Sequence, residues 1–128
     1  MEQVQYGIEA CIDASHCETD KMTREGIGEF IEELCERIDM NPALVTYYWD
    51  EENGGATDEP HLKGTSAFRF IETSNIVIHT LTALKVVFIN VFSCKDFDVS
   101  EAETFVKEYF SAKIAHTQVV KRSYIASE

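Results

Sequence analysis

Four side chains that could take part in chemistry lie in one apolar stretch of the sequence. They are two hydroxyls, an imidazole and a thiol, at Ser66, Ser74, His79 and Cys94. A serine or cysteine near a histidine is typical of nucleophilic catalysis, because the imidazole can take the proton of the nucleophile. For ordinary hydrolysis, however, no acid obviously orients His79, and a G-x-S-x-G motif is absent. The residue types therefore indicate nucleophilic chemistry of another kind.

Each of these side chains also has a purely structural interpretation. A thiol such as Cys94, on an apolar strand, most often packs as a small hydrophobic group. His79 could be a strand histidine whose hydrogen bonds are satisfied, and Ser74 a turn residue between two strands. It is the occurrence of all of them in one segment that favours a functional site.

The segment that holds these residues is predicted to form three consecutive β-strands. Ser66–Thr73, Asn75–Thr80 and Val86–Cys94 are rich in β-branched and aromatic residues, which suit a half-buried pleated surface. The three remaining strands are predicted at Val4–Asp13, Ala43–Trp49 and His116–Arg122.

Two amphipathic helices are predicted, one on each side of the central strands. Apolar residues from Ile27 to Ile38 recur at helical spacing after Thr23, a suitable N-cap, and Asn41-Pro42 should end this helix. A second stripe runs from Ala102 to Phe110, behind a capping box at Ser100 to Glu103. The order β-α-β-β-β-β-α-β predicts an α+β fold, a two-layer sandwich in which both helices cover one face of an antiparallel sheet.

The sheet face away from the helices is predicted to be covered by a second copy of the chain. Phe68, Phe70, Phe88 and Phe92 would make that face too apolar to remain in water. Two sheets packed face to face around a two-fold axis give a homodimer with four layers, αββα.

The length, charge and cysteine pattern of the sequence limit the kinds of protein and of binding site that it can form. The 128 residues fit a single domain, 1–128, and the net charge of -12 with a pI of about 4.6 opposes binding to nucleic acid or to an acidic membrane surface. The sequence opens without a basic segment and has no apolar run of about 18 residues, so we expect a cytoplasmic protein with reduced thiols. We expect no metal site, because the cysteines form no C-x-x-C pair and His16-Cys17 near Cys11 does not fit zinc-ligand spacing.

Three short motifs surround the four side chains. They read Gly64-Thr65-Ser66, then Thr73-Ser74-Asn75-Ile76-Val77-Ile78-His79-Thr80, then Asn90-Val91-Phe92-Ser93-Cys94. These motifs resemble the bacterial and archaeal S-adenosylmethionine decarboxylase proenzymes, which read G-x-S, E-S-H-x-x-I-H-T and D-x-F-x-C. The spacings between the four side chains agree with that family without gaps, and the predicted order of elements agrees over nearly the whole chain.

The resemblance implies a cofactor that the chain makes from itself. Ser74 would attack the preceding carbonyl, and the chain would be cut between Thr73 and Ser74, leaving residues 1–73 and 74–128 with a pyruvoyl group at position 74. Ser66 and His79 would hold and activate the carbonyl, with His79 as the base for elimination. The pyruvoyl carbonyl would form a Schiff base with the amine of the substrate and accept the electrons left by carbon dioxide. Cys94, whose ordinary pKa of about 8.5 keeps it a thiol at neutral pH, would donate the proton that replaces it.

The implied activity is that of a carboxy-lyase in polyamine (spermidine) synthesis, with a small amino-acid or amine substrate. The sequence departs from the family where the nucleoside should bind. Ala83 stands where the family has a glutamate for the ribose hydroxyls, and Pro60–Lys63 lacks the aromatic that stacks on adenine; Asn75 and Thr73 replace a histidine and a glutamate beside the cut. Two alternatives follow, a pyruvoyl-dependent arginine or ornithine decarboxylase and an unprocessed, non-catalytic homologue that binds a partner protomer.

Overall fold

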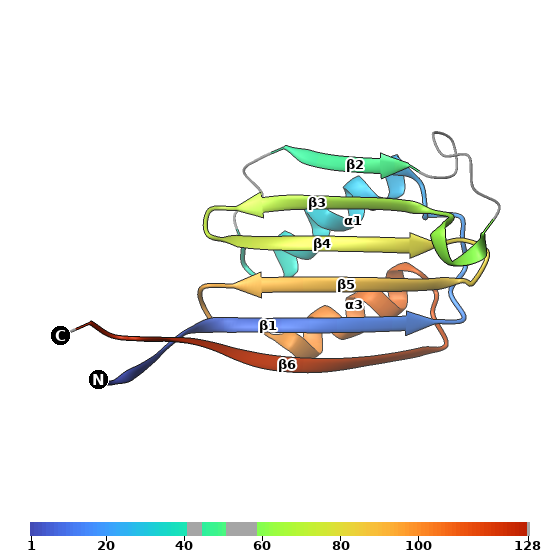
Figure 1. Cartoon of the computed structure of the whole chain (residues 1–128). Coiled ribbons are helices and arrows are strands. Elements are labelled where there is room, and N and C mark those ends of the chain that lie inside the picture. The colour runs from blue at the N-terminus through green and yellow to red at the C-terminus, as the bar shows by residue number, and fades with distance from the viewer. Residues whose placement is uncertain (41–44, 51–58, 128) are drawn as a thin grey trace.

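The computed structural model describes residues 1–40, 45–50 and 59–127. Six strands form one antiparallel sheet in the order β2-β3-β4-β5-β1-β6 (Figure 1). The strands are β1 (Gln3–Ser15), β2 (Thr46–Asp50), β3 (Thr65–Ile71), β4 (Ser74–Leu81), β5 (Val86–Ser93) and β6 (Ile114–Ile125). The helices are α1 (Arg24–Arg37) and α3 (Val99–Tyr109), with a short 3-10 helix η1 (Pro60–Leu62) before β3.

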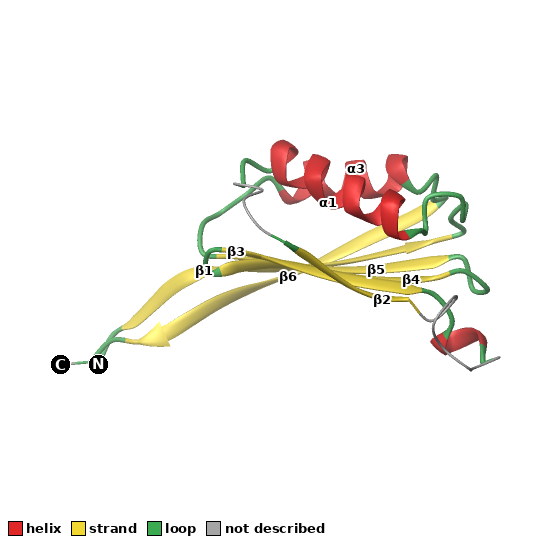
Figure 2. Cartoon of the chain, turned by 90° about the horizontal axis from the view of Figure 1, so that it is seen from above, coloured by secondary structure: helices red, strands yellow, loops and turns green. Residues whose placement is uncertain are grey.

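Both helices lie on the same face of the sheet (Figure 2), which confirms the predicted two-layer α+β sandwich. Every second residue of the central strands points toward the helices, as the period of a strand requires. Ile76 and Ile78 of β4 are fully buried there. They belong to the same core as Phe30 of α1 and Phe105 of α3, whose rings stack with their centroids 5.3 Å apart. In the part of the chain that the structure describes, no helix is long and apolar enough to cross a membrane.

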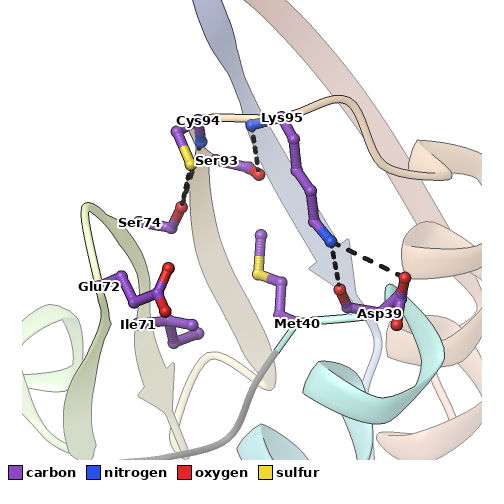
Figure 3. A pocket seen from close by; sticks show the side chains of 8 residues that line it. All are labelled: Asp39, Met40, Ile71, Glu72, Ser74, Ser93, Cys94 and Lys95. Carbon is purple, nitrogen blue, oxygen red and sulfur yellow. Dashed lines mark hydrogen bonds and ion pairs between the residues drawn. The ribbon is translucent and has the colours of Figure 1, made fainter.

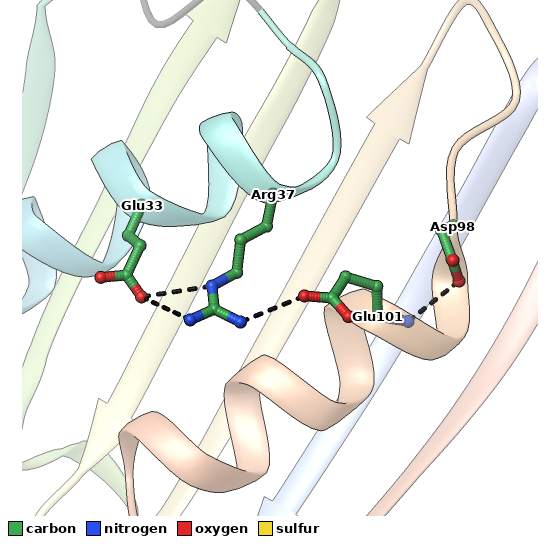
Figure 4. A network of polar contacts seen from close by, with 4 residues as sticks. All are labelled: Glu33, Arg37, Asp98 and Glu101. Atoms are coloured by element: carbon green, nitrogen blue, oxygen red, sulfur yellow. Dashed lines mark hydrogen bonds and ion pairs between the residues drawn. The ribbon is translucent and has the colours of Figure 1, made fainter.

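The predicted N-cap of α1 is confirmed, but that of α3 is wrong by two residues. Thr23 Oγ1 accepts a hydrogen bond from the Gly26 N–H at 3.0 Å. In α3 the cap is Asp98, not Ser100, and its carboxylate accepts from the Glu101 N–H at 3.0 Å (Figure 4). Asp98 and Glu101 have the same three-residue spacing as the predicted Ser100 and Glu103, so the pattern alone could not choose between them.

An ion pair joins the two helices over the sheet. Arg37 of α1 lies 3.2 Å from Glu33 of the same helix and 3.1 Å from Glu101 of α3 (Figure 4). All three side chains are partly exposed, so solvent screens the network, which contributes little to stability and mainly aligns the helices.

Several element boundaries differ from the prediction. Helix α1 ends at Arg37, before the predicted Asn41-Pro42, and Asp39 takes a left-handed φ of 56° after it. Residues 41–44 lie outside the described part of the chain, and β2 begins at Thr46 rather than Ala43. Ser74, predicted to lie in a turn or just before a strand, is the first residue of β4.

The face of the sheet away from the helices, which we name the outer face, carries the aromatic residues that the alternation predicted. Phe68, Phe70 and Phe88 are 37%, 56% and 42% exposed. Tyr47 of β2 stacks on Phe68 with the ring centroids 5.1 Å apart, and Phe70 meets Phe68 edge to face at 5.4 Å. This contiguous aromatic surface is what the predicted second copy would cover.

Candidate active site

Ser66 and His79 face each other across β3 and β4 on the outer face. They are direct partners in the antiparallel register, and Ser66 Oγ lies 2.7 Å from His79 Nδ1. A hydroxyl at this distance from an imidazole nitrogen can exchange a proton with it. The predicted association of these two residues therefore has the geometry that acid–base chemistry needs.

The residues around this pair explain two parts of the sequence motifs. A Cβ on Gly64 would lie 1.7 Å from the carbonyl oxygen of Thr80, so only glycine allows this close approach of the backbones. Thr80 Oγ1 donates to the Thr65 carbonyl at 2.8 Å and accepts from the Thr65 N–H at 3.3 Å, and both side chains are buried. Gly64, Thr65 and Thr80 thus fix the register that sets Ser66 opposite His79.

Ser74 and Cys94 form a second pair where β4 begins and β5 has just ended. Cys94 donates its N–H to Ser74 Oγ at 3.1 Å, and the Ser74 hydroxyl donates to Cys94 Sγ at 3.7 Å (Figure 3). Ser74 is 5% exposed, so its hydroxyl is held by this contact rather than by bulk solvent. The side chain of Thr73, on the other side of the peptide bond proposed for cleavage, also acts on the thiol and lowers its pKa.

Hydrogen bonds from these hydroxyls lower the pKa of the Cys94 thiol. The bond from Thr73 has the largest effect and that from Ser74 follows, because both favour the charged form of the sulfur. Partial burial and the nearby carboxylate of Glu72 act in the opposite direction, and the net result is still a lowered pKa.

A pocket of about 430 Å³ opens beside the Ser74–Cys94 pair (Figure 3). Its lining combines two acids, one base, and small or apolar groups: Asp39, Met40, Ile71, Glu72, Ser74, Ser93, Cys94 and Lys95. Lys95 Nζ donates to the Asp39 carbonyl at 2.8 Å and lies 3.8 Å from its carboxylate. The pocket can therefore receive a small zwitterion next to the thiol, with charged groups of both signs at its rim.

The structure does not bring the two pairs together within one chain. Ser74 and His79 are five positions apart on the same strand, which separates their Cα atoms by about 17 Å. The odd spacing also turns their side chains to opposite faces, since Ser74 is buried on the helix side and His79 is exposed. His79 and Ser66 cannot touch the Thr73–Ser74 peptide of their own chain.

A second pocket, of about 230 Å³, lies directly at the Ser66–His79 pair. Tyr47, Trp49 and Phe68 contribute aromatic rings to it, on the exposed outer face. Sequence reasoning treated this part of β2 only as a short strand. The run Tyr47-Tyr48-Trp49 is the signal that could have pointed to an aromatic site.

Fold and site together define the class of protein. It is a two-layer α+β domain in which Ser74 begins the second strand of the β3–β4 hairpin and hydrogen-bonds to Cys94, directly after β5. The chain matches the family model described as S-adenosylmethionine decarboxylase over residues 8–123, and it belongs to that family of carboxy-lyases. It is similar to the crystal structure of the adenosylmethionine decarboxylase from Aquifex aeolicus VF5, with a TM-score of 0.74, 20% sequence identity, and coverage of 97% of this chain and 96% of that chain. At this identity the likeness concerns the fold. A comparison with curated proteins gives no match.

Proposed function

We propose that this chain cuts itself between Thr73 and Ser74 and then acts as a pyruvoyl-dependent decarboxylase of the S-adenosylmethionine type, in cytoplasmic polyamine (spermidine) synthesis. The observation that carries the proposal is the pair of contacts between Ser74 and Cys94, at 3.1 and 3.7 Å, beside a pocket of about 430 Å³. A nucleophile for self-cleavage and a proton donor for turnover would then occupy one place. The four free cysteines agree with a reducing compartment.

The residues present fit a pyruvoyl group at position 74. When formed, this group supplies an electrophilic carbonyl that binds the substrate amine and accepts the electron pair released with carbon dioxide. The chain around it provides the rest: β4 fixes position 74 at the start of a central strand, the Cys94 N–H points at it, and the pocket would hold the substrate.

The lowered pKa of Cys94 belongs to the uncut chain. Both hydroxyls that lower it are altered by cleavage, because the Ser74 hydroxyl is consumed and Thr73 becomes a chain end. Loss of the Ser74 bond, and a new carboxylate nearby, both favour the neutral thiol. The proposed cut would thus leave Cys94 protonated near neutral pH, as a proton donor must be.

A homodimer would solve the separation of the two pairs. Suppose that two outer faces pack together around a two-fold axis that lies between the two sheets and perpendicular to the strands. Such an axis reverses the strand direction, so the start of β4 in one copy lies over the end of β4 in its partner. The Ser66–His79 pair of one protomer then approaches the Thr73–Ser74 peptide of the other. The exposed aromatic surface around Phe68 and Phe70 supports this arrangement, because it needs cover.

The direct test is the mass of the purified chain. We expect two fragments, residues 1–73 and 74–128, with the second beginning in a pyruvoyl group rather than serine. Release of carbon dioxide from a substrate should be lost when a carbonyl reagent blocks that group. A single intact chain in a folded, dimeric preparation would instead support the unprocessed, non-catalytic alternative.

Cys94→Ala should separate cleavage from turnover. The variant keeps the Cys94 backbone N–H that holds Ser74, so the two fragments should still form. Turnover should fall by about 10²–10⁴-fold, the usual contribution of a positioned acid. Cys11→Ala is a matched control, since Cys11 is likewise half-buried but lies outside the pocket. If turnover is undiminished in Cys94→Ala, the Cys94 side chain has only a packing role.

Two observations bear on the substrate, and they favour different molecules. Glu72 and Asp39 at the rim of the pocket suit a cationic side chain, as in arginine or ornithine. The aromatic pocket of Tyr47, Trp49 and Phe68, brought by the partner in the proposed dimer, offers a stacking platform for adenine that Pro60–Lys63 does not provide.

We expect S-adenosylmethionine to be the best of these three substrates, bound more weakly than in relatives that keep the ribose-binding glutamate. A missing charge-assisted hydrogen bond at Ala83 costs about 1.5–3 kcal/mol, or roughly one to two orders of magnitude in affinity. The measurement is carbon dioxide release from S-adenosylmethionine, arginine and ornithine by the processed protein. Trp49→Ala should weaken only the first. Preferred turnover of arginine or ornithine would establish the alternative decarboxylase.

A further inference from the structure

The N-terminal end of β1 reaches the Ser74–Cys94 pair, although the proposed chemistry makes no use of it. The register of β1 with β6 shifts between Gln5 and Gly7, so Tyr6 is the extra residue of a β-bulge. Bulges redirect a side chain, and they are common next to active sites. Here the bulge directs the Tyr6 hydroxyl to Thr73 Oγ1, to which it donates at 2.8 Å.

Two further contacts hold Tyr6 in this place. Its ring stacks on Phe92 of β5, with the centroids 6.1 Å apart and the planes 16° from parallel. The next residue, Gly7, lies so close to β5 that a Cβ would come within 1.8 Å of the Ser93 carbonyl oxygen and 2.9 Å of Cys94 Cα. Only glycine permits this approach, so the backbone of β1 is fixed against the residues that carry the site.

We propose that Tyr6 is a positioning residue, which anchors Thr73 and through it orients the Thr73 hydroxyl toward the Cys94 thiol. A threonine hydroxyl has one proton to donate and two lone pairs that accept. Because Tyr6 donates to the oxygen, the Thr73 proton stays free to be donated to the sulfur, which agrees with the effect of Thr73 on the pKa of the thiol. In a chain of this kind each hydrogen bond strengthens the next. The contacts hold in the uncut chain; their part in the reaction rests on the proposed function, since Thr73 carries the carbonyl that Ser74 would attack.

The test measures the thiol directly, in full-length chains kept uncut by Ser74→Ala. The rate at which iodoacetamide alkylates Cys94 is followed against pH by mass spectrometry of the peptide that contains it. Tyr6→Phe keeps the ring on Phe92 and removes only the hydroxyl. The lost hydrogen bond from Tyr6 to Thr73 favoured the Cys94 thiolate. The pH midpoint of alkylation should therefore rise by about half a pH unit. Thr73→Val should raise it further, and Tyr6→Phe should add nothing in the Thr73→Val background.

Matched controls separate this effect from loosening of the fold. Tyr124→Phe, at an exposed tyrosine of β6, should leave the midpoint unchanged, and the buried Cys17 and Cys35 should stay unreactive in every variant. An unmoved midpoint in Tyr6→Phe, or the same rise with and without the Thr73 hydroxyl, would overturn the proposal. Where Ser74 is kept, Tyr6→Phe should slow the appearance of the two fragments by up to about tenfold. Absence of cleavage in the wild type refutes the proposed function alone, since the thiol measurements do not depend on it.

Discussion

Ser74→Ala should give a single chain of full length that folds, forms the same oligomer and releases no carbon dioxide. The substitution removes only the hydroxyl group, which in the proposed reaction is the nucleophile for cleavage and is needed to convert Ser74 into the pyruvoyl group. In the folded chain the change leaves the Cys94 N–H without its acceptor, which costs about 1 kcal/mol. That is small against the 5–15 kcal/mol by which domains are stabilised, so the loss of activity should not reflect unfolding.

The measurements are a denaturing gel, the mass of the chain, and the denaturant midpoint of unfolding. Ser123→Ala is the matched control, because this exposed serine of β6 does not line the pocket, and the variant should be cut like the wild type. Fragments of unchanged mass from the Ser74→Ala chain would show that cleavage occurs elsewhere or by an external protease, and the proposed function would fail.

The strands could be predicted from composition because the relevant information is local. Alternation along Ser66–Cys94 indicated which residues share a face, and the spacing of Ser66, Ser74, His79 and Cys94 indicated a common origin in one family. The same alternation already implied that Ser74 and His79, five positions apart, point to opposite faces. The prediction that Ser74 and His79 form one site within one chain did not take this alternation into account.

Other features depend on contacts between distant segments, which no local pattern encodes. The contact of Tyr6 with Thr73 arises from a bulge in β1 and from the fit of Gly7 against Ser93. Helix α3 begins at Val99, so Asp98 and not Ser100 is its N-cap, and this starting point is set by the fold rather than by the local spacing. Lys95 and Asp39 are 56 positions apart in the sequence, and they meet because the segments after α1 and after β5 adjoin the same pocket.

The separation of the two pairs leads to the second large effect, which concerns cleavage between protomers. Ser66 and His79 lie about 17 Å from the Thr73–Ser74 peptide of their own chain, and the His79 side chain points to the face opposite that of Ser74. Under the proposed function, the pair would therefore act on the peptide of a partner. His79→Ala alone should therefore abolish cleavage, as Ser74→Ala does. Mixed dimers of the two variants, however, contain one complete set of groups: the intact Ser74 of one chain and the intact His79 of the other.

Co-expression of the two variants under different affinity tags should restore cleavage in one chain only. The His79→Ala chain keeps its own Ser74 and receives Ser66 and His79 from its partner, so it should be cut, whereas the Ser74→Ala chain stays whole. With random pairing of equal amounts, about half of the His79→Ala chains sit in mixed dimers, which sets the upper limit of cleavage. Sedimentation of each variant should show the dimer that this requires. If the mixture stays uncut, or if His79→Ala is cut without a partner, the Ser66–His79 pair does not serve the neighbouring protomer, and its hydrogen bond on the outer face is structural.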